Sequence, residues 1–215
     1  MIEWLRWVID FILHIDDHLQ LLIVQYGAWT YGIMFLIIFV ETGLIVTPFL
    51  PGDSLLFAAG ALSANGSLNP MLIFIILTMA AILGDTVNYW AGSYIGTHVF
   101  KEDAKVLKLE YLHRTEDFFA KHGGKTIFLA RFVPIVRTYA PFVAGASTMH
   151  YPRFILFNIT GAITWVGLFT FGGYFFGNLQ FVQENFGLVV IAIILISVIP
   201  IAIEMTRNKL KKPAE

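Results

Sequence analysis

The stretch ARFVPIVRTYAPFVAG, residues 130–145, places two arginines, Arg131 and Arg137, in an otherwise strongly apolar segment. Pro134 lies between the arginines and Pro141 follows them, so we expect a helix formed here to be broken at both prolines. Six helical residues rotate the side-chain direction by about 600°, and an unbroken helix would therefore point the two guanidinium groups to different faces. A break at Pro134 lets both converge on one site.

An acidic counterpart lies in the first half of the chain, where residues 29–46 are apolar except for Glu41. The next segment, TPFLPGDS (47–54), contains three helix-breaking residues: Pro48, Pro51 and Gly52. Asp53 follows directly. Twelve helical residues would hold the carboxylates of Glu41 and Asp53 about 18 Å apart, whereas a turn between them can bring both together.

The composition of the 215 residues is that of a membrane protein. The chain is 57% hydrophobic and only 13% charged, whereas soluble domains are about a quarter charged. Its net charge of −1 gives no reason to expect a nucleic-acid partner, and the absence of cysteine excludes disulfides and thiolate metal sites. We expect one integral membrane domain without a metal or cofactor.

Two halves of the sequence resemble each other. Short elements containing FAAG and FVAG each precede a long apolar segment that begins near a proline and ends in GSYIG or GYFFG. Interrupted and long segments in corresponding positions indicate an all-α polytopic protein with an inverted repeat. We divide the chain into an amphipathic N-terminal helix (1–27), repeat 1 (28–96), a charged cytoplasmic loop (97–125), repeat 2 (126–177), a C-terminal transmembrane helix (186–206) and a basic tail (207–215).

Charge distribution predicts the orientation of these segments. Residues 97–125 contain six Lys or Arg residues and the tail is basic, so the positive-inside rule places both in the cytoplasm. An even number of crossings must separate them, and the segments 152–177 and 186–206 supply two. Residues 126–147 then form a re-entrant hairpin, which protein or a cavity must shield. The counterpart at 29–63 would enter from the opposite face.

Hairpins that enter from opposite faces would bring Glu41 and Asp53 close to Arg131 and Arg137. The two carboxylates would then neutralise the two guanidinium groups. Arginine forks suit phosphate oxyanions, so a phosphate lipid is the expected substrate. Anion binding would release the carboxylates to accept protons. Asp85, the single acid of residues 70–96, is a second candidate for this role. Two other interpretations stay open: the arginines form structural ion pairs only, and Asp53 caps a helix.

Nearly the whole chain resembles the DedA family of bacterial inner-membrane proteins. The similarity is strongest in FVETGLIVTPFLPGDSLLFAAGAL, GDTVNYWAGSYIG, KHGGKTIFLARFVPIVRTYAPFVAGAS and GGYFFG. The resemblance implies a transporter of lipid-linked phosphate, with undecaprenyl phosphate as the best-supported substrate, that depends on the proton motive force. It implies essential roles for Glu41, Asp53, Arg131 and Arg137. The wider superfamily includes eukaryotic lipid scramblases.

Other functions make different demands on these residues. The string GDSL occurs at residues 52–55, but the Asp-x-x-His that a serine esterase of this type needs is absent from the chain, so we expect no enzyme. Alternatives to coupled transport are a passive scramblase, a proton or ion pathway, and a membrane-organising protein. A transporter needs both acids and arginines, a proton pathway needs mainly the acids, and a scaffold tolerates their joint neutral replacement. The sequence leaves open whether the protein forms a homo-oligomer.

The topology can be tested with single cysteines, because the chain has none. We expect residues 97–125, residues 145–151 and the C-terminus to be cytoplasmic. A cysteine at Ser147 should therefore resist a membrane-impermeant thiol reagent in intact spheroplasts and react after lysis. Strong labelling in intact spheroplasts would contradict the re-entrant hairpin.

Overall fold

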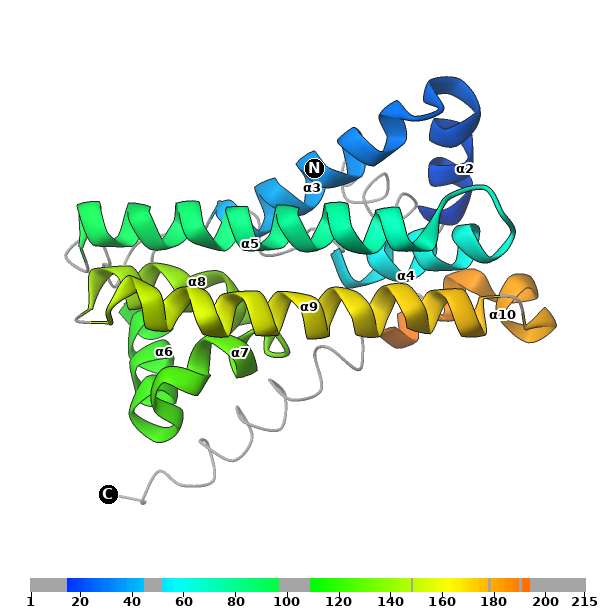
Figure 1. The fold of residues 1–215 in the computed structure, drawn as a ribbon. Coiled ribbons are helices and arrows are strands. Elements are labelled where there is room, and N and C mark those ends of the chain that lie inside the picture. Colours follow the sequence, from blue (N-terminus) through cyan, green and yellow to red (C-terminus); the bar gives the residue numbers. More distant parts are fainter. Residues whose placement is uncertain are drawn as a thin grey trace, which may run out of the picture.

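Two long helices, α5 (Pro70–Ile95) and α9 (Tyr151–Phe176), run antiparallel through the computed structural model (Figure 1). The structure describes residues 15–44, 52–96, 109–147, 149–177, 179–189 and 191–193. Within these ranges every regular element is a helix. Each long helix has 26 residues and is long and apolar enough to cross a membrane, because 26 residues extend about 39 Å and the bilayer core is about 30 Å thick.

Sequence signals explain where α5 begins and ends. The side chain of Asn69 accepts hydrogen bonds from the backbone N–H groups of Met71 and Leu72, both at 3.0 Å, and Pro70 occupies the first turn. This combination of cap and proline is typical of a helix N-terminus. Gly96 follows the last residue with a φ of +79°, a conformation that glycine adopts at little cost. The long segment predicted at 70–96 is therefore confirmed.

Short helices precede each long helix in both halves. Helices α3 (Trp29–Gly43) and α4 (Gly52–Ala64) come before α5, whereas α7 (Thr126–Ala130) and α8 (Pro134–Ala146) come before α9. The first interruption begins at Leu44, which is extended. A new helix starts at Gly52, whereas Pro48 and Pro51 lie outside the described residues.

The second interruption covers residues 131–133. Val133 is extended, with φ −123° and ψ 100°, because the ring of the following Pro134 disfavours helical geometry at the preceding residue. Helix α8 then continues through Pro141, so the second break predicted at that residue is wrong. Pro141 has no N–H and so leaves the Arg137 carbonyl without its usual helical donor. Asn88 of α5 donates from Nδ2 to the adjacent Thr138 carbonyl at 2.9 Å, so α5 contacts the backbone of α8 at this turn.

Helix α4 packs against α9 through facing glycines. A β-carbon on Gly60 would collide with the carbonyl of Thr170, and one on Gly173 would collide with the carbonyl of Phe57. The two backbones are therefore in direct contact, which is the small-residue packing common between membrane helices.

Helix α8 packs against α5 in the same manner. A β-carbon on Gly145 would meet the carbonyl of Tyr89, and one on Gly92 would meet the carbonyl of Phe142. Helices α4 and α8 thus occupy opposite halves of the space between the long helices (Figure 1). Each short helix is held against a long helix of the other half of the chain.

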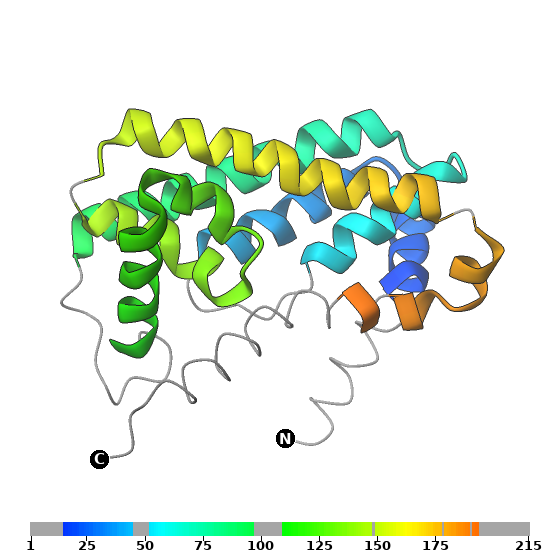
Figure 2. The same ribbon diagram turned by 90° about the horizontal axis from the view of Figure 1, so that it is seen from below.

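The remaining helices lie at the two ends of this arrangement. They are α2 (Ile15–Tyr26), α6 (Leu109–His122), the 3-10 turn η2 (Gly123–Lys125) and α10 (Gln180–Glu184). Helices α6 and α7 lie at the α8 end, and α2 and α10 lie at the α4 end (Figure 2). The charged segment predicted at 97–125 thus contains α6, which ends at His122, immediately before Gly123 with a φ of +58°.

The described residues include only parts of the two terminal segments that were predicted. The N-terminal amphipathic helix predicted at 1–27 is described from residue 15 onward. Of the transmembrane helix predicted at 186–206, residues 186–189 and 191–193 are helical. The rest of that segment and the tail at 207–215 lie outside the described residues.

Adjacent glycines of α9 provide a matched test of the close packing. Gly173→Ala places a methyl group against the Phe57 carbonyl, whereas Gly172→Ala meets nothing within 4 Å. We expect Gly173→Ala to lower the midpoint of thermal unfolding in detergent, at a cost of about 1–3 kcal/mol. Gly172→Ala should leave it unchanged or raise it slightly, because alanine favours helix. Equal midpoints for the two variants would show that the backbones are not in contact.

Candidate functional site

Buried charges gather where the breaks in the short helices meet the middle of the long ones. Glu41, Asp85 and Arg131 are 4%, 4% and 5% exposed, and each comes from a different part of the chain. Asp85 and Trp165 lie near the middle of α5 and α9. Charges buried in a membrane protein need partners, and the partners here cross between the two halves.

Arg137 of α8 bridges two carboxylates. Its Nη2 donates to Glu41 Oε1 at 2.6 Å and its Nη1 donates to Asp53 Oδ1 at 2.9 Å. The side chains of Arg137 and Asp53 retain 15% and 14% exposure, whereas that of Glu41 retains 3%. The two acids on either side of the first interruption, Glu41 and Asp53, therefore meet one arginine of the second half, and each arm of the guanidinium contacts one acid.

Gly52 makes the approach of Glu41 possible. A β-carbon at Gly52 would overlap the Glu41 carboxylate, and the backbone of Gly52 forms a hydrogen bond with that carboxylate. Gly52 is also the first residue of α4, so the acid lies at a helix N-terminus, where the helix dipole favours negative charge. Gly52 was predicted only as a helix breaker, and its role in making room for the acid was missed.

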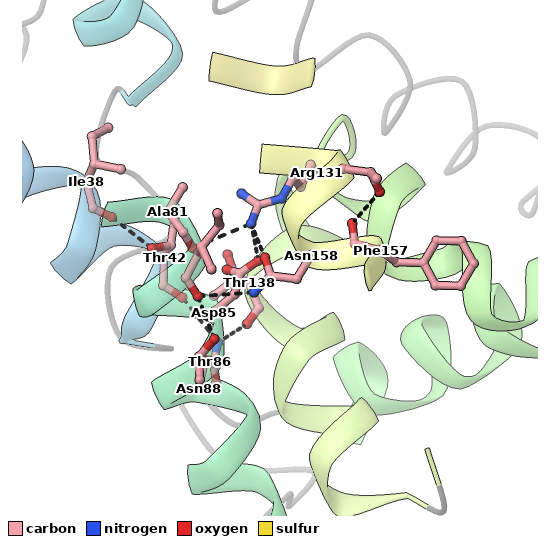
Figure 3. A network of polar contacts seen from close by, with 12 residues as sticks. Ile38, Thr42, Ala81, Asp85, Thr86, Asn88, Arg131, Thr138, Phe157 and Asn158 are labelled. Carbon is pink, nitrogen blue, oxygen red and sulfur yellow. Dashed lines mark hydrogen bonds and ion pairs between the residues drawn. The ribbon is translucent and has the colours of Figure 1, made fainter. Parts of the chain in front are cut away.

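Arg131 has a different set of partners from the one predicted. Its Nη2 donates to Asp85 Oδ2 and to Asn158 Oδ1, both at 2.5 Å, and it lies 3.5 Å from the Ala81 carbonyl oxygen. The prediction that both arginines face Glu41 and Asp53 thus holds for Arg137 alone. Arg131 lies before the break at Pro134, and from that position it reaches α5 and α9 instead (Figure 3). Asp85, the second-ranked acid, is its direct partner.

Two buried asparagines connect the helices around these ion pairs (Figure 3). Asn158 of α9 accepts from Arg131 and donates from Nδ2 to the Ile82 carbonyl at 3.1 Å. Asn88 of α5 donates to the carbonyls of Thr42 and Thr138, at 3.4 and 2.9 Å. Neither asparagine was predicted as a site residue. Their position inside long apolar segments was the available signal, since a polar side chain there needs a partner.

Asp53 has a second donor in Trp165 of α9. The indole Nε1–H donates to Asp53 Oδ1 at 2.8 Å, the same oxygen that accepts from Arg137. Asp53 also lies inside the first turn of α4, so its contacts extend beyond the helix-capping role left open by the sequence. Trp165 was not singled out in the sequence, because a tryptophan in an apolar helix is usually a packing residue.

A cavity of about 20 Å³ lies at the centre of the site. This volume holds about one water molecule, so the arginines face protein carboxylates rather than an open binding pocket. The cavity is lined by Glu41, Thr42, Asp85, Arg131, Arg137, Thr138 and Trp165. Among the residues that the structure describes, no group of three or more His, Cys, Asp or Glu side chains is placed to hold a metal ion.

Comparison with known proteins identifies relatives along most of the chain. The VTT domain family profile matches residues 50–175. Protein DedA of Escherichia coli (strain K12) is 52% identical over 210 residues, which is 96% of each chain. The uncharacterized membrane protein Rv0364 of Mycobacterium tuberculosis is 43% identical over 176 residues, covering 80% of this chain and 77% of the relative. The inner membrane protein YqjA of Escherichia coli (strain K12) is 38% identical over 149 residues, covering 69% and 68%.

No solved structure matches the chain. The matched family region includes α4, α5, α7 and α8 and nearly all of α9, so it contains every charged residue of the site except Glu41. The similarity to DedA extends over both halves of the chain. The chain belongs to the DedA family of VTT-domain membrane proteins.

Proposed function

We propose that this protein transports a lipid-linked phosphate across the bacterial cytoplasmic membrane and couples this movement to protons. The observation that carries the proposal is Arg137, whose guanidinium is held between two carboxylates from the other half of the chain. An arginine inside a membrane protein that is neutralised by two separable acids can exchange those acids for another anion.

Phosphate is the anion that this arginine suits best. The two arms of the Arg137 guanidinium each donate to a separate carboxylate oxygen, and the same planar fork can donate to two oxygens of one phosphate group. A lipid tail would remain on the apolar exterior of the long helices. Large side chains exposed there include Leu83, Val87, Ile163 and Leu168. Undecaprenyl phosphate and phospholipids both have this chemistry.

Proton coupling follows from the burial of the acids. When phosphate binds to Arg137, the Glu41 carboxylate loses its arginine partner. It would then be unpaired in a site where its side chain is only 3% exposed. An unpaired ionised carboxylate is costly to keep in such an environment, and protonation removes that cost. Asp53 is the second acid able to take part, and Asp85 is a further candidate beside Arg131. Binding of the anion would thereby be linked to uptake of a proton.

The architecture that we propose is an inverted repeat with two re-entrant hairpins. Gly145 follows Gly60 by 85 residues and Gly173 follows Gly92 by 81 residues, and these glycines make the equivalent close contacts in the two crossings. Such a relation supports hairpins that enter from opposite faces and meet at the ion pairs. The protein would be multi-pass, with its C-terminus in the cytoplasm.

Passive scrambling, a proton or ion pathway and a membrane-organising role without transport are the alternatives. The first would use the same arginines without coupling, the second would depend mainly on the acids, and the third would need neither. We propose no enzymatic activity. Protons, the phosphate lipid and the surrounding membrane lipids are the proposed partners.

The arginines test the phosphate chemistry. We expect Arg137→Ala and Arg137→Lys to reduce lipid-phosphate translocation in proteoliposomes by about tenfold or more, because an ammonium group cannot make the forked contact. Glu41→Gln should also reduce the rate of translocation, because a neutral side chain cannot alternate between pairing with arginine and carrying a proton. Arg153→Lys is the matched control, because Arg153 is exposed on α9. Full activity of Arg137→Lys would remove the case for forked phosphate binding.

The acids test the coupling. An imposed pH gradient should drive net movement of lipid phosphate in vesicles containing the wild-type protein. Glu41→Gln or Asp53→Asn should abolish the dependence on the gradient while slow equilibration continues, because neither change removes the arginines. Rates and end points in the wild type that are identical at every gradient would instead show passive scrambling.

A further inference from the structure

Trp165 contacts an acid and both arginines of the site without carrying a charge. It is 2% exposed and lines the central cavity. Its indole N–H donates to Asp53, and the guanidinium carbons of Arg137 and Arg131 lie 5.6 and 5.9 Å from the centroid of its ring. One side chain of α9 therefore contacts members of both ion-pair groups.

The hydrogen bond to Asp53 matters most when Arg137 is occupied by an anion. In the present structure Asp53 Oδ1 accepts from Arg137 at 2.9 Å and from Trp165 at 2.8 Å. If phosphate binds to the guanidinium, Asp53 loses its hydrogen bond from Arg137 but keeps the one from Trp165. An indole N–H can donate to this oxygen whether the acid is ionised or protonated. Trp165 would therefore lower the cost of separating Asp53 from Arg137.

The indole ring has a second effect on the arginines. Its face attracts cations at about 6 Å, and this attraction strengthens where water is excluded. Gly161, one helical turn before Trp165, leaves space for the stem of Arg131, because a β-carbon there would lie 3.1 Å from the Arg131 Cδ. Gly161 and Trp165 thus form one face of α9 along which Arg131 lies. This face can hold the arginines in place while their anionic partners change.

We propose that Trp165 is a positioning residue for phosphate exchange, which holds Asp53 through its indole N–H when Arg137 releases that acid. The inference rests on the proposed function, since it concerns the same phosphate site. It differs from an ordinary packing role, because packing alone predicts that Trp165 acts independently of Asp53.

Binding of farnesyl phosphate to the purified full-length protein in detergent tests this role, with farnesol as the uncharged control ligand. Isothermal titration calorimetry gives the affinity directly. We expect Trp165→Phe, which keeps an aromatic ring but removes the N–H donor, to weaken binding by about tenfold. Trp90→Phe is the matched control, because Trp90 is 55% exposed on α5, and it should bind as the wild type does.

A double-mutant cycle separates positioning from packing. If Trp165 acts by holding Asp53, the loss caused by Trp165→Phe should nearly disappear in an Asp53→Ala background, because no acid is left to hold. Equal losses in both backgrounds, or unchanged binding by Trp165→Phe, would overturn the inference. Failure of the wild type to bind farnesyl phosphate in preference to farnesol would instead contradict the proposed function itself.

Fluorescence covers the case in which Trp165→Phe does not fold. The chain has five tryptophans, and replacing Trp4, Trp7, Trp29 and Trp90 by phenylalanine leaves Trp165 as the sole indole. We expect its emission to change on addition of farnesyl phosphate but not of farnesol. Calorimetric binding of farnesyl phosphate without any change in this emission would overturn the placement of Trp165 at the exchange site.

Discussion

The contact of the Arg137 guanidinium with Glu41 and Asp53 is the interaction on which the site depends. A guanidinium is always protonated, and taking it out of water costs several kcal/mol unless anions and hydrogen bonds replace the lost solvent. Here the replacement comes from two acids on two helices of the other half. Neither half could bury its own charges, so the ion pairs favour assembly of the halves with each other.

Helix interruptions and glycines provide the geometry that this contact requires. The first interruption ends at Gly52, which lets the Glu41 carboxylate approach the start of α4, and the second separates Arg131 from Arg137. Close backbone contacts at Gly60 and Gly145 then hold the short helices against α9 and α5. A larger residue at these glycines would move a whole short helix, and with it the side chains at the site.

Sequence patterns predicted the elements better than the pairings. Apolar length and a proline near its start located α5, and the charged residues of the apolar segments identified the charged members of the site. Two features depended on three-dimensional placement. Helix α8 continues through Pro141 where it is packed closely against α5, and Arg131, which lies on the other side of Pro134 from Arg137, pairs with Asp85. Trp165 was missed because a tryptophan contacting charged groups has the same sequence context as one that only packs.

The two arginines differ in how easily their partners can be exchanged. Arg131 is 5% exposed and is held by Asp85 and by Asn158, which itself bonds to the backbone of α5. Arg137 and Asp53 are more exposed, at 15% and 14% for their side chains, and both lie near helix interruptions. Less reorganisation is needed to separate the second pair. In the proposed transport, an incoming anion would therefore displace Asp53 from Arg137 first, while Arg131 keeps its contacts with α5 and α9 through Asp85 and Asn158.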